Sequence, residues 1–343
     1  MCVGRRGKQS AQGSDLARPV KLKIAIADYP HTLAVKSGAI PIEGVEPEFV
    51  NVVPQIGAFR RMVRQVEFDV CELAPTTYII ARAFNAPFVA LPIFVMRRFH
   101  HSGFLVRPDA GIKVPKDLEG KKVGVRAYSV TTGVWTRGIF IDDYGLDASK
   151  VTWVVDDEEH VTQMKLPPNV VHAPDGKSLV SMMEAGEIVA GFDGNAGIGR
   201  SGSPTGGWQA AAPGANASYP ELIENVEEVE AAWHRRTGIY PMHGTIVVKD
   251  SVLAENPWIA KSLFDAFSRA KNEWLVRLKS GEANTAGDKK YLALTKVVGD
   301  DPLPFGMEAN MPTIRALEDT AFKQKLIPER VPLARAWVDP LKF

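Results

Sequence analysis

The segment Gly124-Val-Arg-Ala-Tyr-Ser-Val-Thr-Thr-Gly-Val-Trp-Thr-Arg-Gly-Ile-Phe-Ile141 passes from a buried strand into a helix. Val123 and Val125 are the apolar residues on the strand side, directly after a turn signal at 118–121. On the helical side, apolar residues recur at roughly helical spacing, at Val134, Trp135, Ile139 and Ile141. A strand that leads straight into a helix is the building unit of an α/β fold.

Polar side chains that suit an anion lie at the junction between this strand and this helix. The cation Arg126 is followed by three hydroxyls, those of Ser129, Thr131 and Thr132. Thr131 or Thr132 is a natural N-cap, so the unpaired N–H groups of the first turn would face these side chains. The simpler interpretation is that Thr132 only caps the helix and Arg126 only forms a surface pair. Because capping needs one hydroxyl, the segment favours a site for an anion, most simply a carboxylate.

The composition is that of a soluble globular protein long enough for two domains. The chain has 343 residues, of which 45% are hydrophobic and 24% are charged. A formal net charge of +1 argues against a nucleic-acid surface, which normally shows a basic excess. The two cysteines, Cys2 and Cys71, provide neither a disulfide framework nor a zinc site. No apolar run reaches the ~18 residues of a membrane span.

The amino terminus indicates a cytoplasmic protein. Residues 1–20 are basic and polar, with Arg5, Arg6, Lys8 and Arg18, and they hold no apolar run. A secretory signal needs such a run after its basic start, so we expect a disordered tail and a cytoplasmic location. A true start further upstream that added a signal peptide would favour export instead.

Apolar runs bounded by turn residues predict two successive α/β units. In the first unit we expect strands at 21–27, 45–53, 68–73, 88–96 and 103–107, and helices at 56–66 and 75–83. In the second unit we expect strands at 122–126, 151–155 and 188–193, and helices at 132–143 and 178–185. After a turn-rich segment at 194–214 we expect helices at 225–236 and 257–279, a strand within 237–249, and a final helix and tail at 312–343 packed on the first unit.

Two further patterns are given no functional role. The helix at 56–66 carries Arg60, Arg61 and Arg64, which we expect to form a solvated basic face. The glycines at 197–202 match the dinucleotide-binding pattern Gly-x-Gly-x-x-Gly. A proline and further glycines follow where that motif requires a helix, so nucleotide binding is rejected.

The order of these segments resembles the type II periplasmic-binding-protein fold, in which two α/β lobes enclose a ligand cleft. The run from Phe104 to Val125, which ends in Lys-Asp-Leu-Glu-Gly-Lys-Lys-Val-Gly-Val, carries this resemblance. A narrower resemblance is to the 4,5-dihydroxyphthalate decarboxylases, which use this fold as enzymes. It rests on Arg98-Phe-His-His-Ser102, Val134-Trp-Thr-Arg-Gly-Ile-Phe-Ile-Asp-Asp-Tyr-Gly145 and Thr237-Gly-Ile-Tyr-Pro-Met-His243. The loop at 194–204 departs from the family's shorter segment, so the substrate can differ from the family's namesake.

The resemblance implies a two-lobed α/β fold with an interlobe cleft and a defined division of the chain. Residues 1–20 would be the tail, 21–110 plus 244–343 lobe one, and 111–243 lobe two. The implied ligand is a small aromatic carboxylate, such as 4,5-dihydroxyphthalate, which is converted to protocatechuate and CO2 without a cofactor. We expect neither nucleic acid nor a membrane as a partner, and a homo-oligomer is left open.

The implied reaction sets what the cleft must contain. Each carboxylate of 4,5-dihydroxyphthalate lies para to a hydroxyl, so removing the phenolic proton drives charge onto the carbon that loses CO2. The protein must supply a base, a proton donor and a clamp for the carboxylate that stays. The proton-handling candidates are His101, His243, Asp28 and Glu72, and the substrate-binding candidates are Arg126, Ser129, Thr131, Thr132, Arg98, Tyr29 and Asp193. Neither His-x-His nor His-Glu-x-x-His occurs, so no metal site is expected.

Two other classes of protein compete with the enzyme. A solute-binding protein for an aromatic or organic acid would use the same fold, but it would need an export signal. The effector domain of a transcriptional regulator would need an attached DNA-binding module, for which 20 residues are too few. Purified protein that releases CO2 from hydroxylated phthalates would separate the enzyme from both.

Overall fold

The structure is a computed structural model that describes residues 18–203, 206–210 and 218–342. Most of the expected tail at 1–20 therefore lies outside the described residues. None of the helices in the described ranges is long and apolar enough to cross a membrane.

The first lobe is built on a five-stranded sheet in the order β2-β1-β3-β12-β4. Its strands are β1 (Val20–Ala25), β2 (Val45–Phe49), β3 (Val70–Leu73), β4 (Phe88–Arg97) and β12 (Met242–Lys249). β1 runs parallel to β2 and β3, whereas β12 runs antiparallel to β3 and β4. The helices of this lobe are α1 (Leu33–Lys36), α2 (Ile56–Gln65), α3 (Pro75–Ala83), α7 (Asp250–Glu255) and α8 (Ile259–Ser280).

Both faces of this sheet are covered, which explains why its strands are apolar runs. Along β12, Val247 packs with α3 on one face, while Ile246 and Val248 pack with α8 on the other. All four residues of β3 are buried. A sheet covered on both sides buries every side chain of its central strands, so simple alternation disappears.

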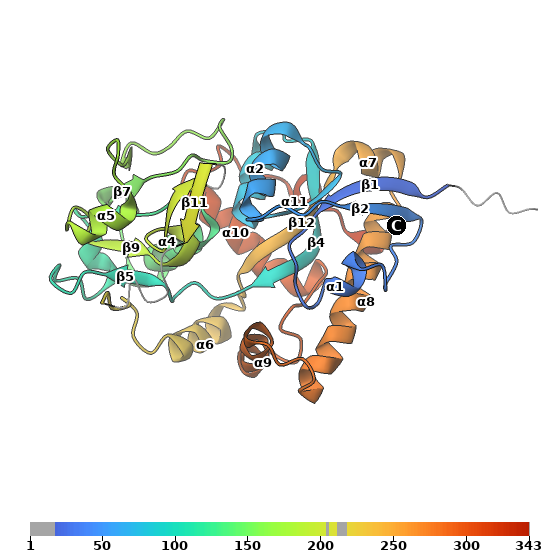
Figure 1. Ribbon diagram of the computed structural model, residues 1–343. Coiled ribbons are helices and arrows are strands. Elements are labelled where there is room, and N and C mark those ends of the chain that lie inside the picture. The colour runs from blue at the N-terminus through green and yellow to red at the C-terminus, as the bar shows by residue number, and fades with distance from the viewer. Residues whose placement is uncertain (1–17, 204–205, 211–217, 343) are drawn as a thin grey trace, which may run out of the picture.

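The second lobe is built on a five-stranded sheet in the order β5-β9-β6-β7-β8. Its strands are β5 (Phe104–Val106), β6 (Lys122–Gly124), β7 (Thr152–Val155), β8 (Val170–His172) and β9 (Ala190–Phe192). The helices α4 (Thr131–Tyr144) and α5 (Leu179–Glu184) belong to this lobe. Figure 1 shows the two sheets as separate lobes lying side by side. The predicted two-lobed α/β fold is confirmed.

The chain changes lobes earlier than the expected boundary at residue 110. β5 pairs with β9, so the first crossover lies between Arg97 and Phe104. On the way back, α6 (Val226–Thr237) precedes β12, whose first residues, Met242 and His243, already belong to the first sheet. The functional consequence is that both crossovers carry histidines next to the space between the lobes.

The turn-rich segment expected at 194–214 contains an antiparallel hairpin, β10 (Arg200–Ser203) and β11 (Gly206–Ala210). The glycine pattern at 197–202 leads into β10 rather than into a helix. The rejection of a dinucleotide-binding motif at this position therefore agrees with the local structure.

One of the C-terminal helices contacts both lobes, whereas the sequence predicted a final helix and tail at 312–343 packed on the first lobe and no helix at 286–298. The C-terminal helices are α9 (Ala286–Val298), α10 (Met311–Lys323) and α11 (Leu333–Ala336). α10 packs on α3 and on α4, and Figure 1 shows it between the lobes. Gln324, just after α10, accepts a hydrogen bond from Arg137 Nε at 2.8 Å and donates one to Val134 O at 2.8 Å.

Candidate functional site

A cavity of about 480 Å³ lies between the two lobes. Residues of lobe one and of the first crossover line one side, among them Tyr29, Gln55, Phe59, Glu72, Thr77, Arg98, His100 and His243. Residues of lobe two line the other side, among them Arg126, Val130, Thr131, Thr132, His160, Asp193 and Asn195. The volume and the mixed polar and aromatic lining suit a small aromatic molecule with several polar groups.

Three helices begin at the wall of this cavity. The lining includes Gln55 and Ile56 at the start of α2, Ala74 at the start of α3, and Val130 at the start of α4. The first N–H groups of a helix have no partner within the helix, and the helix dipole makes that end positive. Three such ends around one cavity favour an anionic ligand.

The hydroxyls at the start of α4 tie the lobes together instead of capping the helix. Val130, not Thr131 or Thr132, occupies the N-cap position, so the expected cap is wrong. Thr131 Oγ1 lies 2.6 Å from Thr76 Oγ1 of lobe one. Thr132 Oγ1 accepts a hydrogen bond of 2.7 Å from Arg98. The N–H groups of the first turn of α4 are therefore left without a hydroxyl cap.

Arg126 is buried in the cavity wall and paired with a carboxylate. Its Nη1 donates to Asp157 Oδ2 at 2.9 Å and its Nε donates to Asn195 O at 3.0 Å. The side chain is 2% exposed, which excludes the surface pair considered from the sequence. Burial lowers the pKa of Arg126, and Asp157 opposes that shift. Since Asp157 neutralises it, Arg126 offers a ligand less charge than an isolated arginine would.

Arg98 is the cation in the lining that has no carboxylate partner among the described residues. It donates to Thr132, while its Nε is buried and makes no hydrogen bond within the described part of the chain. Burial lowers the pKa of Arg98. A partly buried guanidinium without a counter-ion is costly, and an anionic ligand would remove that cost.

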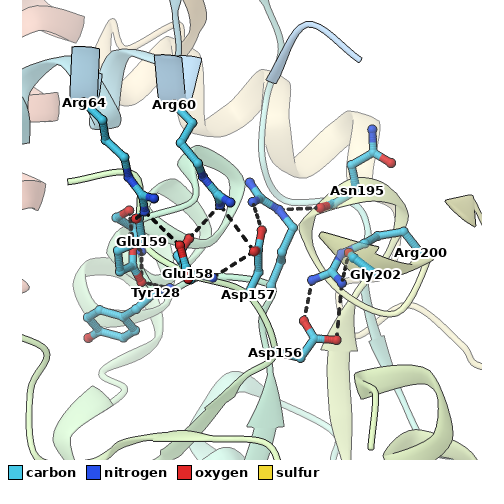
Figure 2. Close-up of polar contacts among 12 residues, drawn as sticks. Arg60, Arg64, Tyr128, Asp156, Asp157, Glu158, Glu159, Asn195, Arg200 and Gly202 are labelled. Atoms are coloured by element: carbon cyan, nitrogen blue, oxygen red, sulfur yellow. Dashed lines mark hydrogen bonds and ion pairs between the residues drawn. The ribbon is translucent and has the colours of Figure 1, made fainter. Parts of the chain in front are cut away.

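Arg60 and Arg64 of α2 form hydrogen bonds and ion pairs with the second lobe, as Figure 2 shows. Arg60 is 6% exposed and donates to Asp157 Oδ1 at 3.3 Å and to Glu158 O at 3.2 Å. Arg64 donates to Glu158 Oε2 at 3.0 Å and to Glu159 O at 2.8 Å. The prediction of a solvated face is therefore wrong for Arg60, whereas Arg64 is exposed and still contacts the second lobe. Burial would raise the pKa of Asp157, but Arg126 and Arg60 hold it below its usual range.

His243 stands at an irregularity in β12. Met242 pairs with Arg97 and Gly244 pairs with Met96, so His243 is the extra residue of a bulge. A bulge re-aims a side chain, and here the imidazole lines the cavity. Its ring centroid lies 5.2 Å from that of His100, at an interplanar angle of 32°. Burial, and then the positive charge of Arg98, lower the pKa of both imidazoles well below the usual value.

Glu72 and Tyr29 form a second proton-carrying pair in the lining. Tyr29 donates its hydroxyl to Glu72 Oε1 at 2.6 Å, and the N–H of Ala27 donates to Oε2 at 3.1 Å. Burial raises the pKa of Glu72, while these two hydrogen bonds oppose the shift. A Cβ on Gly244 would lie 2.9 Å from Glu72 Oε1, so a glycine is needed beside this carboxylate.

The structure brings most of the predicted site residues together. Eight of them line the cavity: Tyr29, Glu72, Arg98, Arg126, Thr131, Thr132, Asp193 and His243. Asp193 is exposed, and its N–H donates to Gly103 O, next to the pairing of β5 with β9.

Three predicted residues do not line the cavity. Ser129 donates to the Glu159 carboxylate with its N–H and its hydroxyl. Asp28 is exposed and pairs with Lys36. His101 packs against Trp233, with ring centroids 5.2 Å apart.

The sequence reasoning missed two histidines of the lining, His100 and His160. Of the adjacent pair His100-His101, the predicted member, His101, is the one that does not line the cavity. The fold fixes this choice through Thr136 on α4, which donates to His100 O at 2.8 Å. His160 follows β7, and the rule that ligands bind beyond the carboxyl ends of strands could have found it.

Across the described residues, no three His, Cys, Asp or Glu side chains are grouped so that they could hold a metal ion.

Buried neutral histidines predict a loss of stability in acid that one variant can isolate. Burial lowers the pKa of His31 to about 4, and its Nε2 bonds Val95 O at 2.9 Å. Below about pH 6.5 the unfolded chain binds a proton that the folded chain refuses, so stability falls until about pH 4. Between pH 7 and pH 5, wild type should lose roughly 2 kcal/mol more than His31→Gln in denaturant unfolding.

The comparison with His31→Gln is needed because buried acids act in the opposite sense. Burial raises the pKa of Glu230 to about 7. As the pH falls, protonation of this carboxyl therefore stabilises the folded protein over part of the same range. The same pH dependence in both proteins would contradict the assignment to His31.

Comparisons with known proteins agree with this fold. A family model described as the periplasmic substrate-binding protein of a phosphonate ABC transporter matches residues 44–165. The alkanesulfonate-binding protein of Xanthomonas axonopodis pv. citri, bound to MOPS, has a TM-score of 0.52 at 15% identity over 94% of this chain and 99% of its own. The desulfurization enzyme DSZB has a TM-score of 0.52 at 13% identity over 92% of this chain and 96% of its own. These likenesses show the periplasmic-binding-protein fold.

Two relatives carry more sequence similarity. A 4,5-dihydroxyphthalate decarboxylase of Comamonas testosteroni is 32% identical over 276 residues, which are 77% of this chain and 78% of the relative. A second one, of Pseudomonas putida, is 35% identical over 179 residues, which are 50% of this chain and 69% of the relative. The chain therefore belongs to the 4,5-dihydroxyphthalate decarboxylase family, within the periplasmic-binding-protein fold.

Proposed function

We propose that the protein is a carboxy-lyase that removes one carboxylate from a hydroxylated aromatic dicarboxylate of the phthalate type. The specific reaction is the conversion of 4,5-dihydroxyphthalate, or a close analogue, to protocatechuate and CO2. Its two relatives are named for this substrate. The observation in this chain that carries the proposal is one cavity that combines an unpaired arginine and helix N-termini with His243 and Glu72.

The reaction needs one proton removed from oxygen and one proton delivered to carbon. A base takes the proton of the hydroxyl para to the departing carboxylate, and the charge spreads to the ring carbon that bears this carboxylate. A donor protonates that carbon, the bond to the carboxylate breaks, and its electron pair restores the aromatic ring as CO2 leaves. The retained carboxylate must be held throughout, so that the ring does not move between these steps.

We assign the carboxylate clamp to Arg98, Thr132 and the first turn of α4. These groups come from both lobes and meet through the hydrogen bond from Arg98 to Thr132. Arg126 lies in the same cavity, but it shares its charge with Asp157. Charge-assisted hydrogen bonds from an arginine to a carboxylate are short and strong, particularly away from water.

We assign the proton transfers to His243 and Glu72. Their environments push the two pKa values in opposite directions, because burial favours neutral imidazole and also favours the protonated carboxyl. A neutral imidazole is ready to accept the phenolic proton, and a protonated carboxyl is ready to donate. His101, predicted as the second proton carrier, packs against Trp233 instead of lining the cavity.

Activity should survive removal of divalent metals, because arginine, helix N-termini and proton carriers handle every charge in this scheme. The measurement is CO2 release before and after dialysis against a strong chelator, with protein dialysed against buffer alone as the control. A complete loss that only a divalent metal restores would contradict the proposed chemistry.

A solute-binding protein is the second candidate, favoured by the family model that matches residues 44–165. Incubating purified protein with 4,5-dihydroxyphthalate and measuring CO2 separates the two, because a receptor would bind one equivalent without turnover. Phthalate, which has no hydroxyl, is the control and should release no CO2. We also propose a cytoplasmic location, which fractionation of cells producing the full-length protein would test.

A further inference from the structure

The two chain crossovers between the lobes run side by side and bring two histidines together. Met242 pairs with Arg97, and the N–H of Arg98 donates to Pro241 O at 3.3 Å. The bulge then turns His243 toward His100. His100 is buried, with 1% of its surface exposed. The ring centroids of the two histidines lie 5.2 Å apart. Neither crossover alone would form this pair.

The pair has nitrogen atoms that nothing in the described chain satisfies. His100 Nε2 and His243 Nδ1 are buried and have no hydrogen-bond partner among the described residues. Arg98 Nε beside them is in the same state. Buried polar atoms in native proteins are nearly always paired, so three unpaired atoms on residues that line one cavity point to a ligand that supplies oxygen atoms.

Basic groups dominate the surroundings of the two rings. Arg98, His101 and Lys290 act on the pair, and all of them disfavour its protonation. Two acids of this region already have partners: Glu72, beside Gly244, accepts from Tyr29 and Ala27, and Glu230 lies near His101. Without an anionic ligand, both imidazoles are therefore neutral at pH 7. A negative charge placed against them would favour binding of a proton.

We infer that His100 and His243 act as one proton-binding unit, which captures a single proton when an anionic aromatic ligand occupies the cavity. With a catechol ligand, the O–H bond breaks, the proton moves to a ring nitrogen, and the electron pair stays on the oxygen. With a ligand that has no hydroxyl, the proton comes from solvent. His100, which was not among the site residues predicted from the sequence, is thus the partner that shares the abstracted proton with His243. This inference rests on the proposed function for its ligand class.

The two sources of the proton give a test that does not depend on turnover. Phthalate should bind with uptake of about one proton per site at pH 7, seen as a heat of binding that varies with the ionisation enthalpy of the buffer. Protocatechuate should bind with almost no uptake, and its absorption should shift to longer wavelength as the catechol ionises. In His100→Asn, phthalate uptake should fall by about half or more, and the absorption shift should weaken.

His172→Asn is the matched control, because His172 is exposed in β8 and should leave both signals unchanged. If His100→Asn does not fold, the wild-type calorimetry with the two ligands still decides. Phthalate heats that are the same in every buffer, or no phthalate binding at millimolar concentration, would overturn the inference. Proton uptake without CO2 release would keep the inference and reject the decarboxylase; CO2 release without uptake would do the reverse.

Discussion

Turnover of 4,5-dihydroxyphthalate should fall by roughly 10²–10⁴-fold when His243 is replaced by asparagine, the usual size of a general acid–base contribution. Asparagine keeps a polar side chain of similar reach but cannot carry the phenolic proton. The loss should appear in kcat more than in substrate binding, because proton transfer matters only in the transition state.

The pH profile of wild type gives a second readout for His243. At low pH the imidazole becomes protonated and cannot accept, so the rate should fall on the acid side. At high pH Glu72 loses the proton that it must donate, so the rate should fall on the alkaline side. The apparent pKa values of this bell belong to the coupled groups and not to single residues.

Two further variants serve as comparisons for His243→Asn. His101→Asn tests the prediction from the sequence that His101 is a proton-handling residue, although its ring packs against Trp233. His172→Asn, at an exposed position, controls for the loss of any imidazole. A His243→Asn protein with turnover within a few-fold of wild type would make His243 structural and leave the carboxyls as the proton carriers.

Replacing Arg98 by alanine should cost roughly 2–5 kcal/mol in kcat/KM, as for the loss of one partner of a buried charged pair. This corresponds to about 30- to 5,000-fold, since each 1.36 kcal/mol is tenfold. Phthalate affinity should fall as well, because Arg98 has no carboxylate partner until the ligand provides one. Lysine should rescue poorly, because it lacks the two-pronged fork of arginine.

Arg126→Ala should also lose activity, but for a partly different reason. It removes one of the two arginines that hold Asp157 and leaves that carboxylate facing the cavity wall. The double variant Arg126→Ala/Asp157→Ala should therefore recover part of the loss. No recovery would mean that Arg126 itself binds substrate, as the sequence first suggested. Wild-type kinetics in Arg98→Ala would remove Arg98 from the clamp.

The fold could be predicted because its signals are local. Apolar runs in strands such as β3 and β4 reflect burial on both faces, and strand–helix junctions such as the one before α4 recur along the chain. Errors arose where distant segments decide the outcome. Arg60 of α2 looks like part of a solvated face until the loop at 157–160 folds against it and buries it.

The candidate site was predictable in its residue types but not in its pairings. Arg126 was found from its place after β6, yet its partner Asp157 lies 31 residues away on another strand end. Choosing between His100 and His101 required the hydrogen bond from Thr136 and the bulge at His243. A bulge is a long-range property of two strands, and no pattern within β12 alone reveals it.

The grip of Arg60 and Arg64 on the loop at 157–160 bears on how such proteins can be recombined. Asp157 is buried against arginines from both lobes, so a chimera that takes its lobes from two relatives would keep this carboxylate only if both arginines came with it. If one of these arginines were missing, the Asp157 carboxylate would lose a partner while it stays buried in the wall of the cavity. A chimera of this protein should therefore take α2 and the 157–160 loop from the same parent, although they belong to different lobes.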